Sequence, residues 1–544
     1  MAYFSLHAYD ADVWVREFRG LNQADVMMNP DPRFAAEEEN LETIHGVLQP
    51  QAANEIETGP AGGAAKVETL AVMHRRWYTG AGDRNWYICA AGGVLYQKQK
   101  GDVGGWVPIP MPEGIDAFLS NVWSWVTYEI NPSDTTVDVM LLSNSKDGMY
   151  MIIPPDTNTL WSTMKNTKTW GGAKDMTWGE VKAAKWSVEP VETRTDPEDD
   201  SEPQKKFAVI ERFQERIFGC GVPDHPDSLF YSRTYDPTDW TPDAVNPDAG
   251  AGQIDQPTFD GDQFFALKRF GDQLLAFKKN RIFRVYGIGP ADFTFNEQFA
   301  EGTEFFNTIA VHGERVYMAG RNGLSVYDGM SSAPYAREQV EQVWKGVNAS
   351  ALDQMCSAFY DNKYYFSFPT GDSAANNAML VYDMTEGNIL LFTDFCIESF
   401  LPTGDELFAT SSTLPGKIIR MKYDSWTEGK AIGAKTKWVS PWMDFGYKRI
   451  QKGGFDFYFL PEVQDEAVEF AISIQTEKKC KTKQYTCQPL TAEQKEIPKE
   501  HRMKRLHFGG MGRKFRIIIE TAAGVTAPWR IVGGLQLVVE TDPD

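Results

Sequence analysis

Residues 271–287 read GDQLLAFKKNRIFRVYG, and residues 313–329 read GERVYMAGRNGLSVYDG. Both stretches share one pattern: a glycine and an acidic residue, an apolar run, a polar turn that contains asparagine, and a returning segment that contains tyrosine. This pattern predicts a β-hairpin, and Asn280 and Asn322 suit the turns because asparagine tolerates positive φ. The copies begin 42 positions apart, at 271 and 313, which matches the spacing of four-stranded propeller blades. The repeat therefore predicts a β-propeller.

Two unrelated hairpins in a large β protein would also contain these segments, so the rest of the chain has to support the repeat. Strand-like runs continue from about residue 68 to residue 424 and group into six to eight blades. Aromatic residues make up 13% of the 544 residues, and few stretches have helical periodicity, apart from residues 336–347. We therefore expect an all-β protein whose body, residues 61–430, is a β-propeller, with Phe277 and Ile282 facing blade interfaces.

The chain changes character on both sides of this body. Residues 1–60 contain paired prolines and the run Glu37–Glu39, and they can bury little on their own. We expect an extended N-terminal arm that is ordered by another surface, either the body of its own subunit or a neighbour. Residues 431–544 contain alternating runs such as Val468–Ile474, which predict a C-terminal β-sandwich with one face in solvent.

Two segments interrupt these domains. Residues 154–206 form an irregular insertion, rich in tryptophan at first and then acidic and broken by prolines, and we expect part of it to pack on the body or on a neighbouring subunit. Residues 478–504 are predicted to be a basic loop, the clearest positive cluster in a chain whose net charge is −21. A nucleic-acid or lipid contact is open for this loop, but a solvated loop that faces an acidic neighbour is the favoured interpretation.

The motifs give no catalytic signature. The sequence contains no Walker-type loop, HExxH, GxSxG or EF-hand pattern, and its seven histidines do not cluster at ligand spacing. We expect no catalytic, cofactor-binding or metal-binding residues. Cys480 and Cys487 lack the second pair that zinc needs, and the sequence leaves open whether they form a disulfide. We also expect no secretory signal, no membrane span and assembly in a reducing cytoplasm.

The hairpins and the arm together resemble one family, the tail and neck β-propeller proteins of tailed bacteriophages, known as nozzle or tail-stabilisation proteins. The similar segments touch most of the chain and are structural rather than catalytic. In the arm, they run from 20–22 through 39–42 to 46–48. In the body, one runs from 215–221 through 229–232, and another runs from 260–262 through 277–279 to 285–287. In the sandwich, they run from 504–506 to 515–517 and include 540–542.

The resemblance implies a virion structural protein of the tail or neck rather than an enzyme. Such a protein forms a homo-oligomeric ring, commonly a hexamer, that is stacked below the portal and adaptor and contacts other tail proteins. It is assembled in the host bacterial cytoplasm, and its lumen passes genomic DNA without specific binding and helps to retain the genome until ejection. The acidic balance fits a surface past which DNA slides. The alternative function is a host-glycan-binding or glycan-cleaving β-propeller used in attachment.

Overall fold

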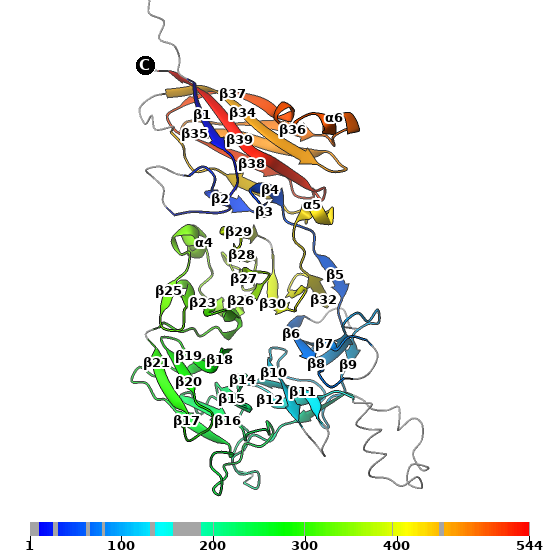
Figure 1. Cartoon of the computed structure of the whole chain (residues 1–544), viewed down its shortest axis with the longest axis vertical. Coiled ribbons are helices and arrows are strands. Elements are labelled where there is room, and N and C mark those ends of the chain that lie inside the picture. Colours follow the sequence, from blue (N-terminus) through cyan, green and yellow to red (C-terminus); the bar gives the residue numbers. More distant parts are fainter. Residues whose placement is uncertain are drawn as a thin grey trace, which may run out of the picture.

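The computed structural model describes residues 10–24, 31–60, 66–78, 82–130, 136–155, 186–199, 201–298, 300–393, 395–444 and 451–542. Within these residues, seven four-stranded antiparallel sheets follow one another around a ring, and two larger sheets form a separate sandwich (Figure 1). The innermost strand of the last sheet packs beside the innermost strand of the first and closes the ring. The protein is therefore an all-β propeller with a β-sandwich, and the expected range of six to eight blades narrows to seven.

The blades alternate short strands with tight turns, and in the first six of them the four strands are consecutive in the chain. Blades one to three consist of β6 (Val67–His74), β7 (Asn85–Ala91), β8 (Val94–Gln99) and β9 (Val107–Pro108); β10 (Ser124–Ile130), β11 (Val137–Asn144), β12 (Gly148–Ile153) and β13 (Ser187–Pro190); and β14 (Val209–Phe213), β15 (Arg216–Cys220), β16 (Ser228–Tyr231) and β17 (Gly252–Asp255). Blades four to six consist of β18 (Phe264–Phe270), β19 (Gln273–Lys278), β20 (Ile282–Tyr286) and β21 (Thr294–Gln298); β22 (Ala310–His312), β23 (Arg315–Gly320), β24 (Gly323–Tyr327) and β25 (Ser332–Pro334); and β26 (Cys356–Tyr360), β27 (Lys363–Phe368), β28 (Ala378–Asp383) and β29 (Asn388–Thr393).

The repeated hairpins are the second and third strands of two successive blades, β19–β20 in the fourth and β23–β24 in the fifth. Phe277 and Ile282 are fully buried between these blades, where they pack with Val316 and Met318. The predicted hairpins and their interface positions are therefore confirmed. The 42-residue repeat works because each blade buries one face of its sheet against the next blade, so equivalent positions need similar apolar residues.

The backbone of the turns differs from the expectation. Asn280 and Asn322 do not have positive φ; positive φ falls instead on glycines, at 61° on Gly271 and 57° on Gly313, which open the two hairpins, and at 116° on Gly323, which follows Asn322. In the first turn, the Asp262 carboxylate accepts hydrogen bonds from the backbone N–H groups of Lys279 at 3.0 Å and Asn280 at 2.8 Å. These bonds hold the first turn without positive φ at Asn280, so the turn does not need a residue that tolerates positive φ.

The seventh blade is completed by the N-terminal part of the chain. Its inner three strands are β30 (Ile397–Pro402), β31 (Leu407–Ser411) and β32 (Lys417–Arg420), and its outer strand is β5 (Glu55–Thr58), which pairs antiparallel with β32. Arg420 reinforces the pairing with ion pairs to Glu55 at 3.2 Å and Glu57 at 2.6 Å. Because this blade joins segments more than 350 residues apart, the ring opens only if these backbone hydrogen bonds break.

The sandwich also contains strands from both ends of the chain. One sheet consists of β1 (Asp10–Val15), β3 (Leu41–Ile44), β4 (Val47–Pro50), β39 (Trp529–Asp542), β34 (Gln451–Val463) and β37 (Lys504–Gly512); the other consists of β2 (Glu37–Glu39), β33 (Thr436–Val439), β38 (Phe515–Thr521), β35 (Val468–Thr476) and β36 (Cys480–Cys487). The two inner faces bury one core that includes Trp438, Phe470 and Trp529. The alternation in Val468–Ile474 therefore predicts the sandwich correctly.

The first sixty residues are consequently not a separate unit. Their described part supplies β1 to β4 to the sandwich and β5 to the propeller. Each of these strands is too short and too polar to bury a core alone, but each joins a sheet through backbone hydrogen bonds, with β4 between β3 and β39. Of the two surfaces that the sequence leaves open for this arm, the structure places it on the body of its own chain.

The sandwich is fixed to the outer strand of the sixth blade, β29 (Figure 1). The backbone N–H of Asn40 donates to Leu391 at 2.9 Å, and its side chain accepts from the N–H of Thr393 at 2.8 Å while donating to the Thr393 hydroxyl at 3.1 Å. The N–H of Leu21 donates to the carbonyl of Ile389 at 2.7 Å. These bonds connect the two domains directly through their backbones.

The helical content is small. In the segment 336–347, where the periodicity predicts a short helix, the structure has the 3₁₀ turn η3 (Glu338–Val340) followed by α4 (Glu341–Lys345), so the prediction is confirmed. Trp161, Trp170 and Trp178 of the insertion lie outside the described residues. The remaining helical turns are η2 (Phe306–Thr308), η4 (Leu352–Gln354), α5 (Ser425–Glu428), α6 (Ala492–Glu496) and η5 (Lys499–Arg502).

Candidate functional site and interaction surfaces

A groove with a volume of about 360 Å³ opens on one face of the propeller, beside blades four to six. It lies where the loops that lead into β22 and β26, the first strands of blades five and six, meet the turn between β23 and β24. Aromatic and charged residues from four chain segments line it together. They are Phe265, Glu304, Phe305, Phe306, Asn307, Arg321, Ala349, Ser350, Leu352, Asp353 and Met355.

Hydroxyl groups hold the wall of this groove in place. The Thr303 hydroxyl donates to the carbonyl of Ala319 at 2.5 Å, and the Thr308 hydroxyl accepts from the N–H of Ala319 at 3.1 Å. Gly302 permits the close approach, since a β-carbon there would lie 2.0 Å from the Lys278 carbonyl oxygen. The loop that presents Phe305 is therefore anchored to β23 rather than free to move.

The groove combines aromatic surface with a fixed ion pair. The Glu304 carboxylate pairs with the Arg321 guanidinium and raises its pKa, while Asp353 adds a second carboxylate. Such a combination can bind a ligand that has both an apolar face and polar edges, such as a sugar or a peptide side chain. Among the described residues, no group of three or more His, Cys, Asp and Glu side chains is arranged to hold a metal ion.

One lysine of the first hairpin turn is structural, which the sequence did not reveal. Lys278 is fully buried, and its ammonium donates to the Asp227 carboxylate at 2.6 Å and to the carbonyls of Gln256 at 2.8 Å and Asp262 at 2.7 Å. These three acceptors compensate for the loss of hydration. Lys278 therefore connects blades three and four, whereas Lys279 beside it is half-buried and lies 4.0 Å from the Glu304 carboxylate.

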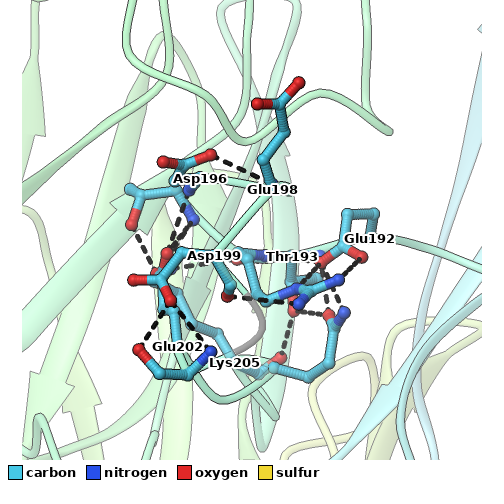
Figure 2. Close-up of polar contacts among 11 residues, drawn as sticks. Glu192, Thr193, Asp196, Glu198, Asp199, Glu202 and Lys205 are labelled. Atoms are coloured by element: carbon cyan, nitrogen blue, oxygen red, sulfur yellow. Dashed lines mark hydrogen bonds and ion pairs between the residues drawn. The ribbon is translucent and has the colours of Figure 1, made fainter.

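The acidic end of the insertion, of which residues 192–199 and 201–205 are described, is a hydrogen-bonded loop between β13 and β14 (Figure 2). The Glu202 carboxylate accepts from the backbone N–H groups of Thr195 and Asp196, both at 2.9 Å, and pairs with Lys205 at 2.7 Å. Partial burial opposes ionisation of Glu202, but the Lys205 ammonium and these hydrogen bonds lower its pKa to about 2. A hydrogen bond from Arg194 likewise lowers the pKa of Glu192 to about 2. The loop therefore keeps its negative charge throughout the physiological range of pH.

Three carboxylates project from this loop into solvent. Asp196, Glu198 and Asp199 are exposed and have no ion pair within 4.0 Å among the residues that the structure describes. Figure 2 shows the Glu198 carboxylate pointing away from the rest of the network. We call residues 192–199 and 201–205 the acidic loop.

The predicted basic loop, residues 478–504, is only partly a loop. Its first half is the edge strand β36, which pairs with β35, and its second half contains α6 and η5. Lysine-rich sequence resembles a loop because its residues are polar, but an edge strand needs apolar residues only where it meets the core, here Tyr485 and Cys487. We call β36, its leading turn and the neighbouring strand β37 the basic edge.

The cysteines show no disulfide among the described residues. Cys480 is exposed at one end of β36, and Cys487 is buried in the sandwich core at the other end. The seven-residue length of strand that separates them excludes a bond between the two, because a disulfide requires Cα atoms within about 7 Å. The structure thus answers the question that their spacing leaves open. No described helix is long and apolar enough to cross a membrane.

No protein-family profile and no curated protein matches the chain. Among solved structures, it is similar to the WD40 domain of Pan2 from Neurospora crassa, at 11% identity and a TM-score of 0.35 over 66% of this chain and 88% of that one. It is also similar to the β-propeller domain of the Trilobed protease from Pyrococcus furiosus, at 10% identity and a TM-score of 0.32 over 66% of this chain and 96% of that one. The similarity to PorZ, a surface component of the type IX secretion system of Porphyromonas gingivalis, has 10% identity and a TM-score of 0.34 over 87% of this chain and 52% of PorZ. The chain thus spans about half the length of PorZ, and each of these similarities is one of fold.

Proposed function

We propose that this protein is a structural subunit of a bacteriophage tail or neck, of the nozzle type, whose copies form a ring around the DNA exit channel. The observation that carries the proposal is the way in which the chain joins its two domains. Strands from residues 10–58 complete both sheets of the sandwich and the last blade of the propeller. This construction supports a building block that transmits force without opening, which a channel under the pressure of a packaged genome requires.

Backbone hydrogen bonds make the subunit resist opening of the propeller and separation of its two domains. The propeller is closed by β5 on β32, and the sandwich is connected to β29 through Asn40 and Leu21. Separating either part breaks these hydrogen bonds and exposes apolar surface, and each hydrogen bond contributes about 0.5–1.5 kcal/mol net. A rigid subunit is suited to stacking below a portal and adaptor and to contacts with other tail proteins.

The charge of the chain supports passage of DNA without adhesion. The net charge is −21, so a lumen lined by this protein repels the phosphate backbone wherever acidic groups lie within about 10 Å, the Debye length at 0.1 M salt. The basic edge has the opposite sign, and in this proposal it lies away from the lumen. The protein would then retain the genome by closing the channel together with its neighbours rather than by binding the DNA.

Light scattering and DNA retention test the proposal on the full chain. We expect a defined oligomer at micromolar concentration and no retention of duplex DNA at physiological salt. A protein that stays monomeric at every concentration contradicts the ring. Tight DNA binding that weakens steeply with salt contradicts the non-adhesive lumen.

The groove favours one second candidate, the binding of a host glycan during attachment. Its aromatic wall, Phe265, Phe305 and Phe306, lies beside the Arg321–Glu304 pair, which resembles the mixture of apolar and polar groups that small-molecule sites use. A saccharide screen with the wild-type protein and with Phe305→Ala separates the candidates. Binding that disappears in Phe305→Ala supports attachment, and no binding above background supports the purely structural function.

A further inference from the structure

The basic edge contains an unusual number of cations without partners. Residues 478–504 contain eight lysines and arginines against three glutamates. Among the described residues, no carboxylate lies within 4.0 Å of the ammonium groups at the basic edge, whereas Arg502, from the same segment, pairs with the buried Glu462 at 3.3 Å. The five lysines of the basic edge are Lys478, Lys479, Lys481, Lys483 and Lys504.

We propose that the basic edge of one copy docks on the acidic loop of a second copy of this chain. This inference rests on the proposed function, because it names the contact that joins subunits of the ring. Charge complementarity identifies a second copy as the partner of the basic edge. The chain has a net charge of −21, with its clearest positive cluster at one place and a hydrogen-bonded negative loop at another. A second copy supplies the complementary surface in both directions.

The direction of the lysines excludes strand addition as the mode of contact. Lys483 is opposite Ile472 of β35, so it projects from the core side of the sheet, and its ammonium lies 5.7 Å from the ring of Phe508 in β37. Lys481, two residues away, projects on the same side and reaches Gly509 of β37. Charged residues that point inward at a sheet edge prevent another strand from pairing there. The edge is therefore available for ion pairs but not for an intermolecular β-sheet.

The acidic loop is suited to bind the basic edge of another copy. Its backbone is already ordered by Glu192, Glu202 and Lys205, so docking costs little conformational entropy. Its exposed carboxylates, Asp196, Glu198 and Asp199, have no ion pair within 4.0 Å in the described part of their own chain, although the Arg194 guanidinium reaches the backbone carbonyl of Asp199 at 3.2 Å. Ion pairs between such surfaces mainly determine which partner is chosen and in which orientation.

The two surfaces lie at opposite ends of the molecule. Figure 1 shows the sandwich with β36 and β37 at one end and β12 and β14 toward the other. The acidic loop connects β13, which pairs with β12 in the second blade, to β14 in the third. They cannot meet within one chain. A contact between different surfaces of two copies is heterologous, and it generates a closed ring when the rotation between neighbours closes.

Charge reversal on one surface is the first test. We expect the triple variant Lys478→Glu, Lys481→Glu and Lys483→Glu to weaken self-association at least tenfold in sedimentation velocity. We expect wild-type association to weaken as salt is raised from 0.05 to about 0.5 M, because the contact is electrostatic. The control variant Arg269→Glu, Arg315→Glu and Lys430→Glu reverses the same number of exposed cations elsewhere and should associate like the wild type.

Mixing gives a second test that does not depend on loss of function. A variant with Asp196→Lys, Glu198→Lys and Asp199→Lys should also fail to associate alone. In a mixture with the basic-edge variant, each reversed surface finds an opposite charge on the other protein, so association should return. Recovery only in the mixture supports the proposal, and circular dichroism of each variant verifies that both are folded.

The outcomes separate this inference from the proposed function. Rings that form equally well in both charge-reversed variants overturn the docking surface and leave the ring in place. A wild-type protein that never associates overturns both. Duplex DNA that binds the wild type and not the basic-edge variant would assign the lysines to nucleic acid and overturn the docking proposal.

Discussion

We predict that Glu42 makes the junction between the two domains sensitive to pH. It lies in β3, fully enclosed, and its carboxylate accepts a hydrogen bond from the N–H of Asp424 at 3.2 Å. It also borders a cavity of about 20 Å³ whose lining includes Lys363, Tyr365 and Tyr423. Burial disfavours the charged form and raises the pKa of Glu42 to about 7, although the nearby Lys363 opposes the shift.

The direction of the effect follows from proton binding. The ordinary pKa of the glutamate is 4.5, so between pH 4.5 and about 7 the folded protein binds this proton more tightly than the unfolded chain. The free energy of unfolding must then fall as the pH rises through that window. From pH 5.5 to pH 8, this one group contributes a loss of about 2 kcal/mol, because each pKa unit is worth about 1.4 kcal/mol.

Glu42→Gln keeps the shape of the side chain and removes its ionisation. Urea unfolding followed by tryptophan fluorescence should show that the difference in stability between pH 5.5 and pH 8 shrinks by about 2 kcal/mol in this variant. The control Glu39→Gln makes the same change three residues away, on a half-buried side chain of β2, and should leave the difference unaltered. If Glu42→Gln has the same pH dependence as the wild type, Glu42 is already ionised in the folded protein and the reasoning fails.

Three further predictions concern the fold. Phe277→Ala should cost about 3–5 kcal/mol and lower the melting temperature by about 4–7 °C for a propeller of roughly 360 residues, whereas Lys279→Ala should change it by less than about 1 °C; equal shifts would contradict the blade interface. Removing residues 1–58 deletes strands from three sheets, so the product should not fold cooperatively; a soluble, protease-resistant product would show that these strands are dispensable. In the native protein, Cys480 should react rapidly with a maleimide and the buried Cys487 only after unfolding, and the reverse order would contradict their placement.

Local patterns predicted most of the fold. The repeat in 271–287 and 313–329 identified a second and third strand in two successive blades, because those strands are short, adjacent in sequence and buried in equivalent places. The alternation of Val468–Ile474 identified the sandwich, since a strand with one buried face must alternate.

Features that depend on distant partners were not readable. β2 is the sequence Glu37–Glu39, which becomes a strand only because β33, some 400 residues later, provides a sheet edge. Lys278 has the appearance of a turn lysine, and only the fold brings Asp227 to it. The groove likewise has no sequence signature, because its wall comes from loops of three blades whose contact is set by the ring.

Electron microscopy of the purified full chain tests whether the protein forms a ring. We predict closed rings in which one propeller-and-sandwich unit repeats around a central hole, with the sandwich of each unit near the propeller of the next. Particles with the size of a single chain at every concentration and salt would contradict it. So would open filaments without any closed ring, because a channel for DNA requires closure.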